Sequence, residues 1–403
     1  MTLTLLVDLD NTLLGNDMET FIPAYLGALG AHLADLIPPE KMVSTMLTAT
    51  QEMVRNNTFD RTLKEAFDPN FYPPLGLVEE EVRAIIDRFY AEFFPKLQPK
   101  TEFRPQGVDL VEAALARGYQ VGIATNPLFP LTAITQRLDW AGLAPDEVPF
   151  TLVPSYETFH FAKPNPAYFA EFLGRTGWPE GPALMVGNDP DHDVRGAQEM
   201  GIPVFWIENG DESLLEGQPA PDGSGSLADL LPWIDSRPAR GLEPDFSSPS
   251  AMIATLRGSP AALSTLLSDL PEAIWTRRPG SKSWSLTEIA CHLRDVEREV
   301  NLPRLHKITR EDNPFISGVD SDTWADERQY NRQDGPAAFT DFLAARRNSL
   351  TILEQLTPQQ WGRYCRHAIF GPTTLTEIVH FTAIHERLHG RQIHQSLAAV
   401  QTP

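Results

Sequence analysis

The chain has 403 residues, of which 42% are hydrophobic, and its formal net charge is -21. A single hydrophobic core rarely serves more than about 250 to 300 residues, so we expect at least two domains. The negative charge argues against binding to nucleic acid or to an anionic membrane surface, since both are themselves negative. The two cysteines, Cys291 and Cys365, cannot form a disulfide framework and indicate a reducing compartment. With neither a signal peptide nor a membrane span predicted, we expect a cytoplasmic protein.

The first predicted element is a buried strand over residues 3–7, which ends in Asp8 and Asp10. Residues two apart in an extended chain point the same way, so both carboxylates can face one small volume at the carboxyl end of the strand. Carboxylates this close repel unless a cation or a proton lies between them. This favours Mg²⁺, which takes oxygen ligands and often bridges to a substrate phosphate. Two aspartates at this spacing also occur by chance, so the other motifs of the chain must show whether this pair is functional.

Apolar residues recur at three- and four-residue intervals between residues 18 and 97, as at Phe21, Tyr25 and Leu29. This spacing predicts four or so amphipathic helices and no strands. Methionines and aromatic residues at this spacing are interpreted as core residues rather than cofactor contacts.

Strands and helices then alternate. A helix is predicted over residues 108–116, and strands are predicted over residues 119–125, 150–153, 183–186 and 203–207. Such alternation predicts a parallel, doubly wound α/β sheet of five strands.

Polar residues follow these strands, at the edge where open α/β sheets bind ligands. Thr125 and Asn126 follow the second strand, and Lys163 precedes a helix that we expect Pro164 to start. A lysine near a helix N-terminus forms an anion site. Asp189 and Asp193 follow the strand over residues 183–186 and can complete a cation site.

In this order, the residues Asp8, Asp10, Thr125, Lys163 and Asp189 resemble the motifs of the haloacid dehalogenase-like hydrolase superfamily, over residues 1–236. The resemblance implies that Asp8 is a nucleophile that forms an aspartyl-phosphate, and that Asp10 is the general acid and base. Thr125, with Asn126, would hold the phosphoryl group, and Lys163 would neutralise it and position Asp8. This is covalent catalysis with charge stabilisation.

The resemblance also implies a Mg²⁺ site at Asp8, Asp10, Asp189 and Asp193, with Asp10 contributing its backbone carbonyl. Spacing alone leaves two alternatives open for the first ligand of this loop, because either Asn188 or Asp189 could act together with Asp193. We favour Asp189 because it offers a carboxylate, and we expect Asp193 to act in support.

Asp10 favours phosphoryl transfer to a small phosphorylated substrate, because dehalogenase members of the superfamily generally lack a second aspartate. A dehalogenase or phosphonatase reaction is the alternative. The helical segment 16–98 resembles the cap of this family, which closes over the site and selects the substrate.

A Gly-, Pro- and Ser-rich stretch follows, with one short helix near residues 227–234 and a linker at 237–249. Residues 250–403 show no strand pattern. Helices are predicted over residues 251–270, 285–309, 337–356 and 375–400, which makes an all-α four-helix bundle the economical fold.

Three histidines of this second half can form a metal site. His385 and His389 are four residues apart and so share one helix face, and His292 lies on another helix. Such a triad can bind one transition metal, while the alternative is a set of solvated or core histidines. Glu299, two turns after His292, is a candidate fourth or supporting ligand.

The segments 282–297 and 383–393 resemble the DinB-like family of metal-binding four-helix bundles, over residues 250–400. The resemblance implies a transition metal such as Zn²⁺, Ni²⁺ or Fe²⁺ on His292, His385 and His389. Some members are thiol-dependent transferases or isomerases, so this activity stands beside a non-catalytic binding or oligomerising role. A homodimer is left open.

Overall fold

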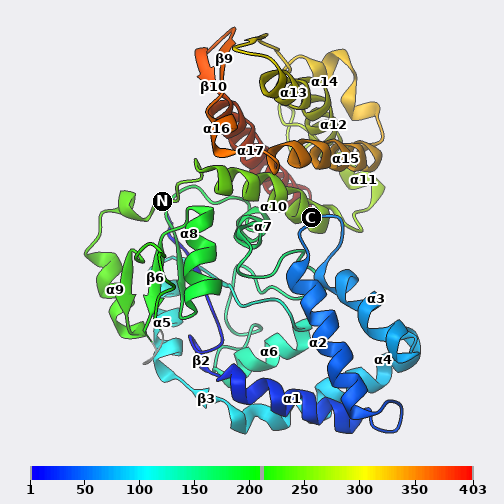
Figure 1. Ribbon diagram of the computed structural model, residues 1–403, viewed down its shortest axis with the longest axis vertical. Helices are drawn as coiled ribbons and strands as arrows, with labels where there is room; N and C mark the ends of the chain where they lie inside the picture. Colours follow the sequence, from blue (N-terminus) through cyan, green and yellow to red (C-terminus); the bar gives the residue numbers. More distant parts are fainter. Residues whose placement is uncertain (1, 209–212, 402–403) are drawn as a thin grey trace. The chain divides into compact units, whose positions relative to one another are not determined.

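The computed structural model describes residues 2–208 and 213–401. The chain divides into two compact units (Figure 1). One, called here the α/β unit, comprises Met1–Phe172 and Glu180–Asp245, and the other, the helical unit, comprises Leu173–Pro179 and Phe246–Pro403. Among the described residues, no helix combines the length and the apolar character that crossing a membrane would require.

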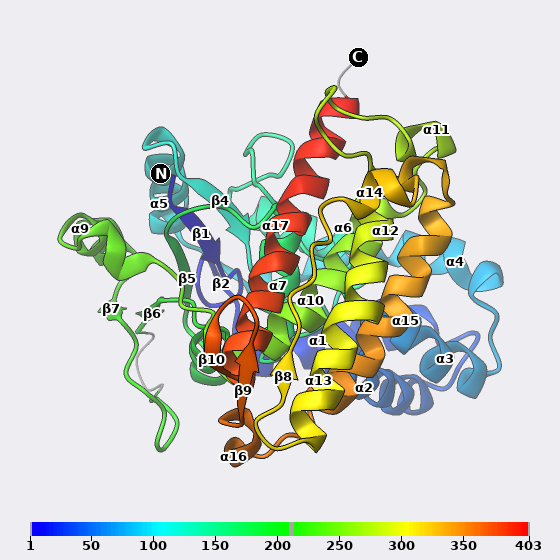
Figure 2. The same cartoon turned by 90° about the horizontal axis from the view of Figure 1, so that it is seen from above.

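The α/β unit is built on a parallel sheet with strand order β4-β1-β5-β6-β7 (Figure 2). The strands are β1 (Thr4–Val7), β4 (Gln120–Ile123), β5 (Ala183–Gly187), β6 (Val204–Ile207) and β7 (Gly223–Gly225). Because all five are parallel, their carboxyl ends meet at one edge, and the loops after β1, β4 and β5 become neighbours. The predicted doubly wound fold is confirmed.

Two details of the sheet differ from the prediction. Residues 150–153 form no regular strand, although Thr151 N donates to Val121 O (2.8 Å) and Ile123 N donates to Leu152 O (2.9 Å). Pro154 follows at once and has no N–H to extend the ladder. The fifth strand is instead β7, whose Gly-Ser-Gly sequence has the composition of a linker. A side chain at Gly223 would collide with the Trp233 ring, 2.3 Å from the built Cβ, so glycine is needed there.

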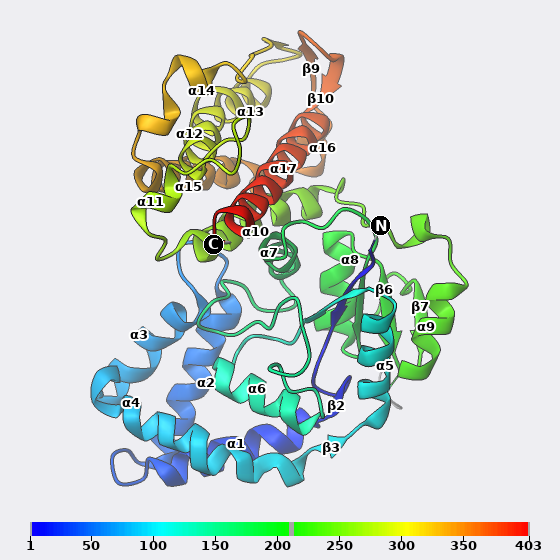
Figure 3. The same ribbon diagram turned by 180° about the vertical axis from the view of Figure 1, so that it is seen from behind.

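The inserted segment, which we expect to be a cap, contains the four predicted helices, visible together in Figure 3: α1 (Met18–His32), α2 (Pro39–Arg55), α3 (Leu63–Leu75) and α4 (Glu79–Arg88). A π-helical turn (Phe89–Phe93) and a 3₁₀ helix (Phe94–Lys100) follow. Two short strands flank the insertion, β2 (Leu14–Gly15) and β3 (Glu102–Phe103), and they pair antiparallel. The first and last residues of the insertion are therefore held together where the insertion branches from the rest of the α/β unit.

The remaining helices before residue 246 are α5 (Pro105–Ala116), α6 (Leu131–Trp140), α7 (Pro166–Arg175), α8 (Gly196–Met200) and α9 (Leu227–Asp235). The helix after Lys163 begins at Pro166, so the prediction that Pro164 starts it was wrong. Asn165 supplies the reason, because its Oδ1 accepts a hydrogen bond from Ala167 N (3.0 Å), as an N-terminal cap does.

The helical unit has the four predicted long helices: α10 (Pro249–Leu267), α12 (Leu286–Val296) continuing through a π-helical turn (Glu297–Asn301) into α13 (Leu302–Arg310), α15 (Gly335–Leu353) and α17 (Leu375–Gln401). Short helices α11 (Glu272–Trp275), α14 (Trp324–Glu327) and α16 (Pro358–Trp361) join them. Three unpredicted strands form a small sheet in the order β10-β9-β8: β8 (Phe315–Ile316), β9 (Tyr364–His367) and β10 (Gly371–Thr374). They have two to four residues each, too few to show an alternating pattern.

A buried ion cluster lies in the core of the helical unit. The Arg346 guanidinium donates to both oxygens of Glu297, from Nε (3.0 Å) and Nη2 (2.9 Å), and Nη2 also donates to Glu386 Oε2 (2.9 Å). All three side chains are 1% exposed. A buried guanidinium that two carboxylates share is costly to desolvate, and losing it leaves two uncompensated charges.

Replacing Arg346 by Met should therefore lower the free energy of unfolding by roughly 3–5 kcal/mol. Arg298→Met is the matched control, because the Arg298–Asp341 pair (3.2 Å) is exposed, and such a pair contributes at most about 1 kcal/mol. Urea unfolding of both full-length variants, followed by circular dichroism, measures the difference. Equal midpoints for the two variants would contradict this account.

Candidate functional site

A cavity of about 510 Å³ opens at the carboxyl edge of the parallel sheet. All seven residues predicted for the first site line it: Asp8, Asp10, Thr125, Asn126, Lys163, Asp189 and Asp193. The aspartates at 8 and 10 follow β1, Thr125 and Asn126 follow β4, and the later aspartates follow β5. The start of the cap adds further lining residues, among them Asn16 and Met18. The sheet topology thus brings together residues that are far apart in sequence.

Lys163 lies at the base of this cavity and is 2% exposed. Its Nζ donates to Asp8 Oδ1 (2.7 Å) and to Asp193 Oδ1 (2.6 Å). Burial alone would lower the pKa of this lysine, but Asp193 and Asp8 raise the pKa above its usual value. Lys163 is therefore a permanent cation that links the loops after β1 and β5.

Asp8 is buried, and burial raises its pKa to about 7, with Lys163 opposing the shift and the charges of Asp193 and Asp10 adding to it. The Thr12 hydroxyl lies 3.3 Å from Asp8 Oδ2 and 3.1 Å from Asn188 Oδ1. Further positive charge beside Asp8 would favour its ionised form, which is the form that acts as a nucleophile.

Asp10 is held by two residues that the sequence did not single out. Its Oδ1 accepts from Asn16 Nδ2 (2.7 Å), and its Oδ2 accepts from Arg137 Nη1 (2.6 Å), with Thr125 Oγ1 at 3.5 Å from the same oxygen. Asn16 precedes the cap and Arg137 lies on α6. Neither residue belongs to a recognisable sequence motif. A lone arginine within a helix normally indicates a solvent-exposed face.

The loop after β5 presents Asn188 and Asp189 differently. Asn188 is 5% exposed and its Oδ1 lies on the Asp8 side, beside Thr12. Asp189 caps the following helical turn: its Oδ1 accepts from Asp191 N and His192 N (2.8 Å each), and its Oδ2 lies 3.1 Å from His192 Nδ1. Burial would raise the pKa of Asp189, but the bonds and charge of His192 hold that pKa well below its usual range.

Asp193 packs tightly against the end of β5. Its Oδ2 accepts from Asp189 N (3.0 Å), and a side chain at Gly187 would collide with it, 2.3 Å from the built Cβ. Gly187 is therefore the residue that lets this carboxylate reach Lys163. Asp191 pairs with Arg195 in a partly exposed position.

The lining of the cavity fits a hard divalent cation. Six carboxylates line it, from Asp8, Asp10, Asp17, Glu19, Asp189 and Asp193, against two permanent cations, Lys163 and Arg137. This excess of negative charge, together with the amide oxygen of Asn188, makes an all-oxygen donor set of the kind that Mg²⁺ prefers.

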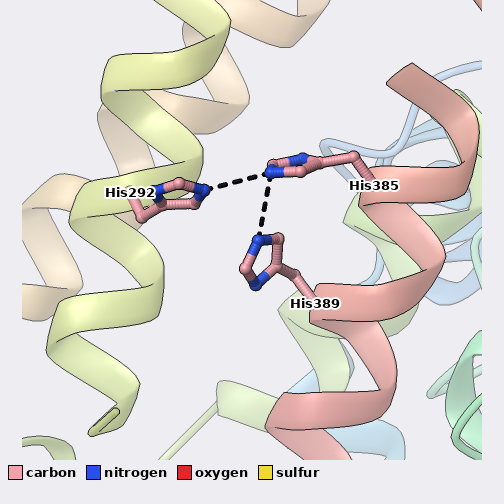
Figure 4. Close-up of side chains that lie close together, drawn as sticks. All are labelled: His292, His385 and His389. Carbon is pink, nitrogen blue, oxygen red and sulfur yellow. Dashed lines mark hydrogen bonds between the residues drawn. The ribbon is translucent and has the colours of Figure 1, made fainter. Parts of the chain in front are cut away.

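The three predicted histidines of the helical unit converge, as Figure 4 shows. His292 on α12 and His385 on α17 bring their Nε2 atoms to 3.0 Å, and His389 Nε2 lies 3.1 Å from His385 Nε2. One ligand atom from each lies within 4.8 Å of the others. Gln392 Oε1 lies 2.9 Å from His389 Nδ1, so a proton on Nδ1 leaves the Nε2 lone pair toward the cluster.

Burial keeps this triad neutral. It lowers the pKa of His292 to about 3, with the charge of His389 adding to the effect, and it also lowers the pKa of His385 and of His389. Neutral imidazoles are the form that binds transition metals. The rings are packed beside Trp284, whose ring centroid lies 4.9 Å from that of His292 and 6.0 Å from that of His389.

Glu299 does not join this cluster, so the expectation of a fourth or supporting ligand there was wrong. Its carboxylate receives two hydrogen bonds from Arg328, from Nη1 (2.6 Å) and Nη2 (3.0 Å), at the surface. The π-helical turn at Glu297–Asn301 adds backbone to one turn and rotates Glu299 away from the face of His292. Cys291 is buried beside Gln333 and is not part of the triad.

Each half of the chain matches a known protein family. Residues 5–207 match the model of the haloacid dehalogenase-like hydrolases, and residues 255–393 match that of the DinB superfamily. A phosphoserine phosphatase of Thermus thermophilus is 28% identical over 156 residues, 39% of this chain and 55% of that protein. A phosphoglycolate phosphatase of Rhodospirillum rubrum is 33% identical over 129 residues, 32% of this chain and 51% of that protein.

The chain therefore spans about half the length of the curated relatives it matches. Among solved structures, YfiT from Bacillus subtilis, described as a probable metal-dependent hydrolase with an unusual four-helix bundle topology, is 18% identical. The match covers 39% of this chain and 90% of that protein, with a TM-score of 0.35. Both resemblances seen in the sequence are confirmed by the family models. The chain belongs to the haloacid dehalogenase-like hydrolase family, and its C-terminal half carries a DinB superfamily region.

Proposed function

We propose that the α/β unit is a Mg²⁺-dependent phosphohydrolase that acts on a small phosphorylated metabolite through an aspartyl-phosphate on Asp8. The observation that carries this proposal is the buried bridge from Lys163 to Asp8 and Asp193, at the base of a cavity that also presents Asp10. The phosphoserine and phosphoglycolate phosphatases among the relatives support a small phosphate ester as substrate.

In the first step, an Asp8 carboxylate oxygen attacks phosphorus, a bond forms from that oxygen to phosphorus, and the bond from phosphorus to the ester oxygen breaks. Lys163 offsets charge on the phosphoryl oxygens, and the Thr125 hydroxyl donates to one of them. Asp10, protonated for this step, gives its proton to the leaving oxygen. In the second step, Asp10 takes a proton from the water that attacks phosphorus, and this displaces Asp8.

The cation would be held by Asp8, by the backbone carbonyl of Asp10 and by one residue of the loop after β5, with Asp193 in support. When bound, Mg²⁺ supplies positive charge that offsets the phosphoryl oxygens. We propose Asn188 for the loop ligand, because it is buried and shares the Thr12 hydroxyl with Asp8, whereas the carboxylate of Asp189 caps a helical turn. The expectation that Asp189 is the ligand stays a prediction, which the variants below test.

We also propose that the helical unit binds a transition metal such as Zn²⁺, Ni²⁺ or Fe²⁺ on His292, His385 and His389. The convergence of three neutral imidazole nitrogens supports this. A thiol-dependent transferase activity and a non-catalytic binding role remain the two alternatives for this metal. The free, buried cysteines Cys291 and Cys365 support a reducing, cytoplasmic setting.

Asp8→Asn should abolish hydrolysis of p-nitrophenyl phosphate in the presence of Mg²⁺, because an amide cannot form the acyl-phosphate bond. Asp191→Asn is the control. That carboxylate follows β5, pairs with Arg195 and has no role in the proposed mechanism. Initial rates of the purified variants measure the effect. Equal rates for Asp8→Asn and the parent would remove the proposal.

Asn188→Ala should raise the Mg²⁺ concentration for half-maximal activity by roughly tenfold or more, because it removes a ligand oxygen. Asp189→Ala should change this concentration little and should instead lower stability by about 1 kcal/mol, since it removes a helix cap. Mg²⁺ titrations and thermal unfolding of both variants separate the two roles. The reverse result would assign the ligand to Asp189.

Elemental analysis of the full-length protein should find a transition metal that is lost in the His385→Ala, His389→Ala double variant. His306→Ala, on α13 and outside the triad, should retain it. Equal metal content in the double variant and the control would exclude this site. Absence of metal from the parent protein would favour a non-catalytic binding or oligomerising role for the helical unit.

A further inference from the structure

Arg137 carries an edge of hydrogen-bond donors that no group of residues 2–208 and 213–401 fills. The residue lies on α6, is 1% exposed and lines the cavity of the α/β unit. Its Nη1 donates to Asp10 Oδ2, and its guanidinium lies over the Phe129 ring, 4.6 Å from the ring centroid. Its Nε and Nη2 are buried and have no hydrogen-bond partner among the described residues.

Buried donors of a charged group are rarely left unpaired, because the loss of hydration costs more than for a neutral group. Nε and Nη2 together form one side of the planar guanidinium, with two N–H bonds that run parallel. This side matches the two oxygens of a carboxylate. The unpaired edge therefore indicates a missing anionic partner of defined shape.

The helical unit shows the same edge when it is filled. Arg346 uses its Nε and Nη2 to bind the two oxygens of Glu297, and it binds a second carboxylate, that of Glu386, at the same time. A buried arginine of this chain thus holds two carboxylates at once. Arg137 binds only one carboxylate, that of Asp10, and its Nε and Nη2 atoms have no partner among the described residues.

The open side is close to the reacting centre. Arg137 Nη1 and Thr125 Oγ1 both contact the same atom, Asp10 Oδ2, so a short carbon chain can connect a phosphoryl group at Thr125 with an anion at Arg137. Asn16, which donates to the other oxygen of Asp10, also lines this cavity. The walls beside them are apolar, from Leu128 and Phe129.

We propose that Arg137 binds a carboxylate of the substrate, so that the enzyme prefers phosphate monoesters of small hydroxy acids. The inference rests on the proposed phosphohydrolase function and adds the substrate class. Arg137 then has two tasks: it positions Asp10 through Nη1 and selects the substrate through Nε and Nη2.

The test compares pairs of esters that differ in charge and not in shape. The phosphate esters of glycolate and of 3-hydroxypropionate are each measured against the ester of the corresponding amide. We expect kcat/KM to be roughly 10- to 100-fold higher for one or both acids, mainly through KM, because a charge-assisted paired hydrogen bond is lost with the amide.

Arg137→Lys and Arg137→Met should remove this preference, since neither has the paired donors. The ratio of acid to amide within each variant cancels any effect that reaches catalysis through Asp10. Arg195→Met, a partly exposed arginine that does not line the cavity, should keep the parent ratio.

Equal turnover of acid and amide by the parent would overturn the inference while leaving the phosphohydrolase intact. So would Arg137 variants that lose rate on both esters and keep the ratio, because Arg137 would then act only on Asp10. A preference for a bisphosphate over both acids would overturn the carboxylate assignment. No turnover of any ester would instead remove the proposed function itself.

Discussion

The α/β unit depends on one buried cation, the ammonium group of Lys163, held between two carboxylates. Such a group is costly to remove from water, and Asp8 (2.7 Å) and Asp193 (2.6 Å) together offset that cost. Asp8 depends on Lys163 in turn, because burial raises the pKa of this carboxyl and the charge of Lys163 opposes that shift. This mutual dependence fixes the loops after β1 and β5 and the segment before α7 against each other. The cavity has its shape because these three segments cannot separate.

The cap connects to this centre through the first residues after β1. The pairing of β2 with β3 joins its two ends, and Asn16, just before α1, donates to Asp10. Asp10 therefore receives one hydrogen bond from the cap side and one from Arg137 on the sheet side. The segment expected to act as a cap is thus in direct contact with the carboxylate proposed to protonate the leaving group.

Much of this architecture could be predicted from the sequence, because strand ends and helix faces follow from short periodic patterns. The position of Asp8, Asp10, Thr125 and Asp189 in one cavity follows from the parallel topology, whereas Lys163 follows no regular strand and was identified from its place before a helix and from the family resemblance. The partners of these residues could not be predicted in this way. Arg137 is recognised only when its burial is known, and spacing could not tell that Asp189 turns to cap a helical turn.

The helical unit shows the same limit. Helix spacing placed His385 and His389 on one face, and the family resemblance added His292 from another helix. Spacing misplaced Glu299, because a π-helical turn intervenes and has no clear sequence pattern. The strands β8 to β10 were missed because, at two to four residues each, they are too short for an alternating pattern to stand out from the surrounding sequence. Patterns that extend over several turns are therefore reliable, and single-residue geometry is not.

The central claim is that Asp8 becomes covalently phosphorylated during turnover. The most direct measurement is reduction of the working enzyme with borohydride, followed by mass spectrometry of the peptide that contains residue 8. We predict that Asp8 is converted to homoserine only when substrate and Mg²⁺ are both present. An unmodified Asp8 under turnover, or reduction at another aspartate, would contradict it.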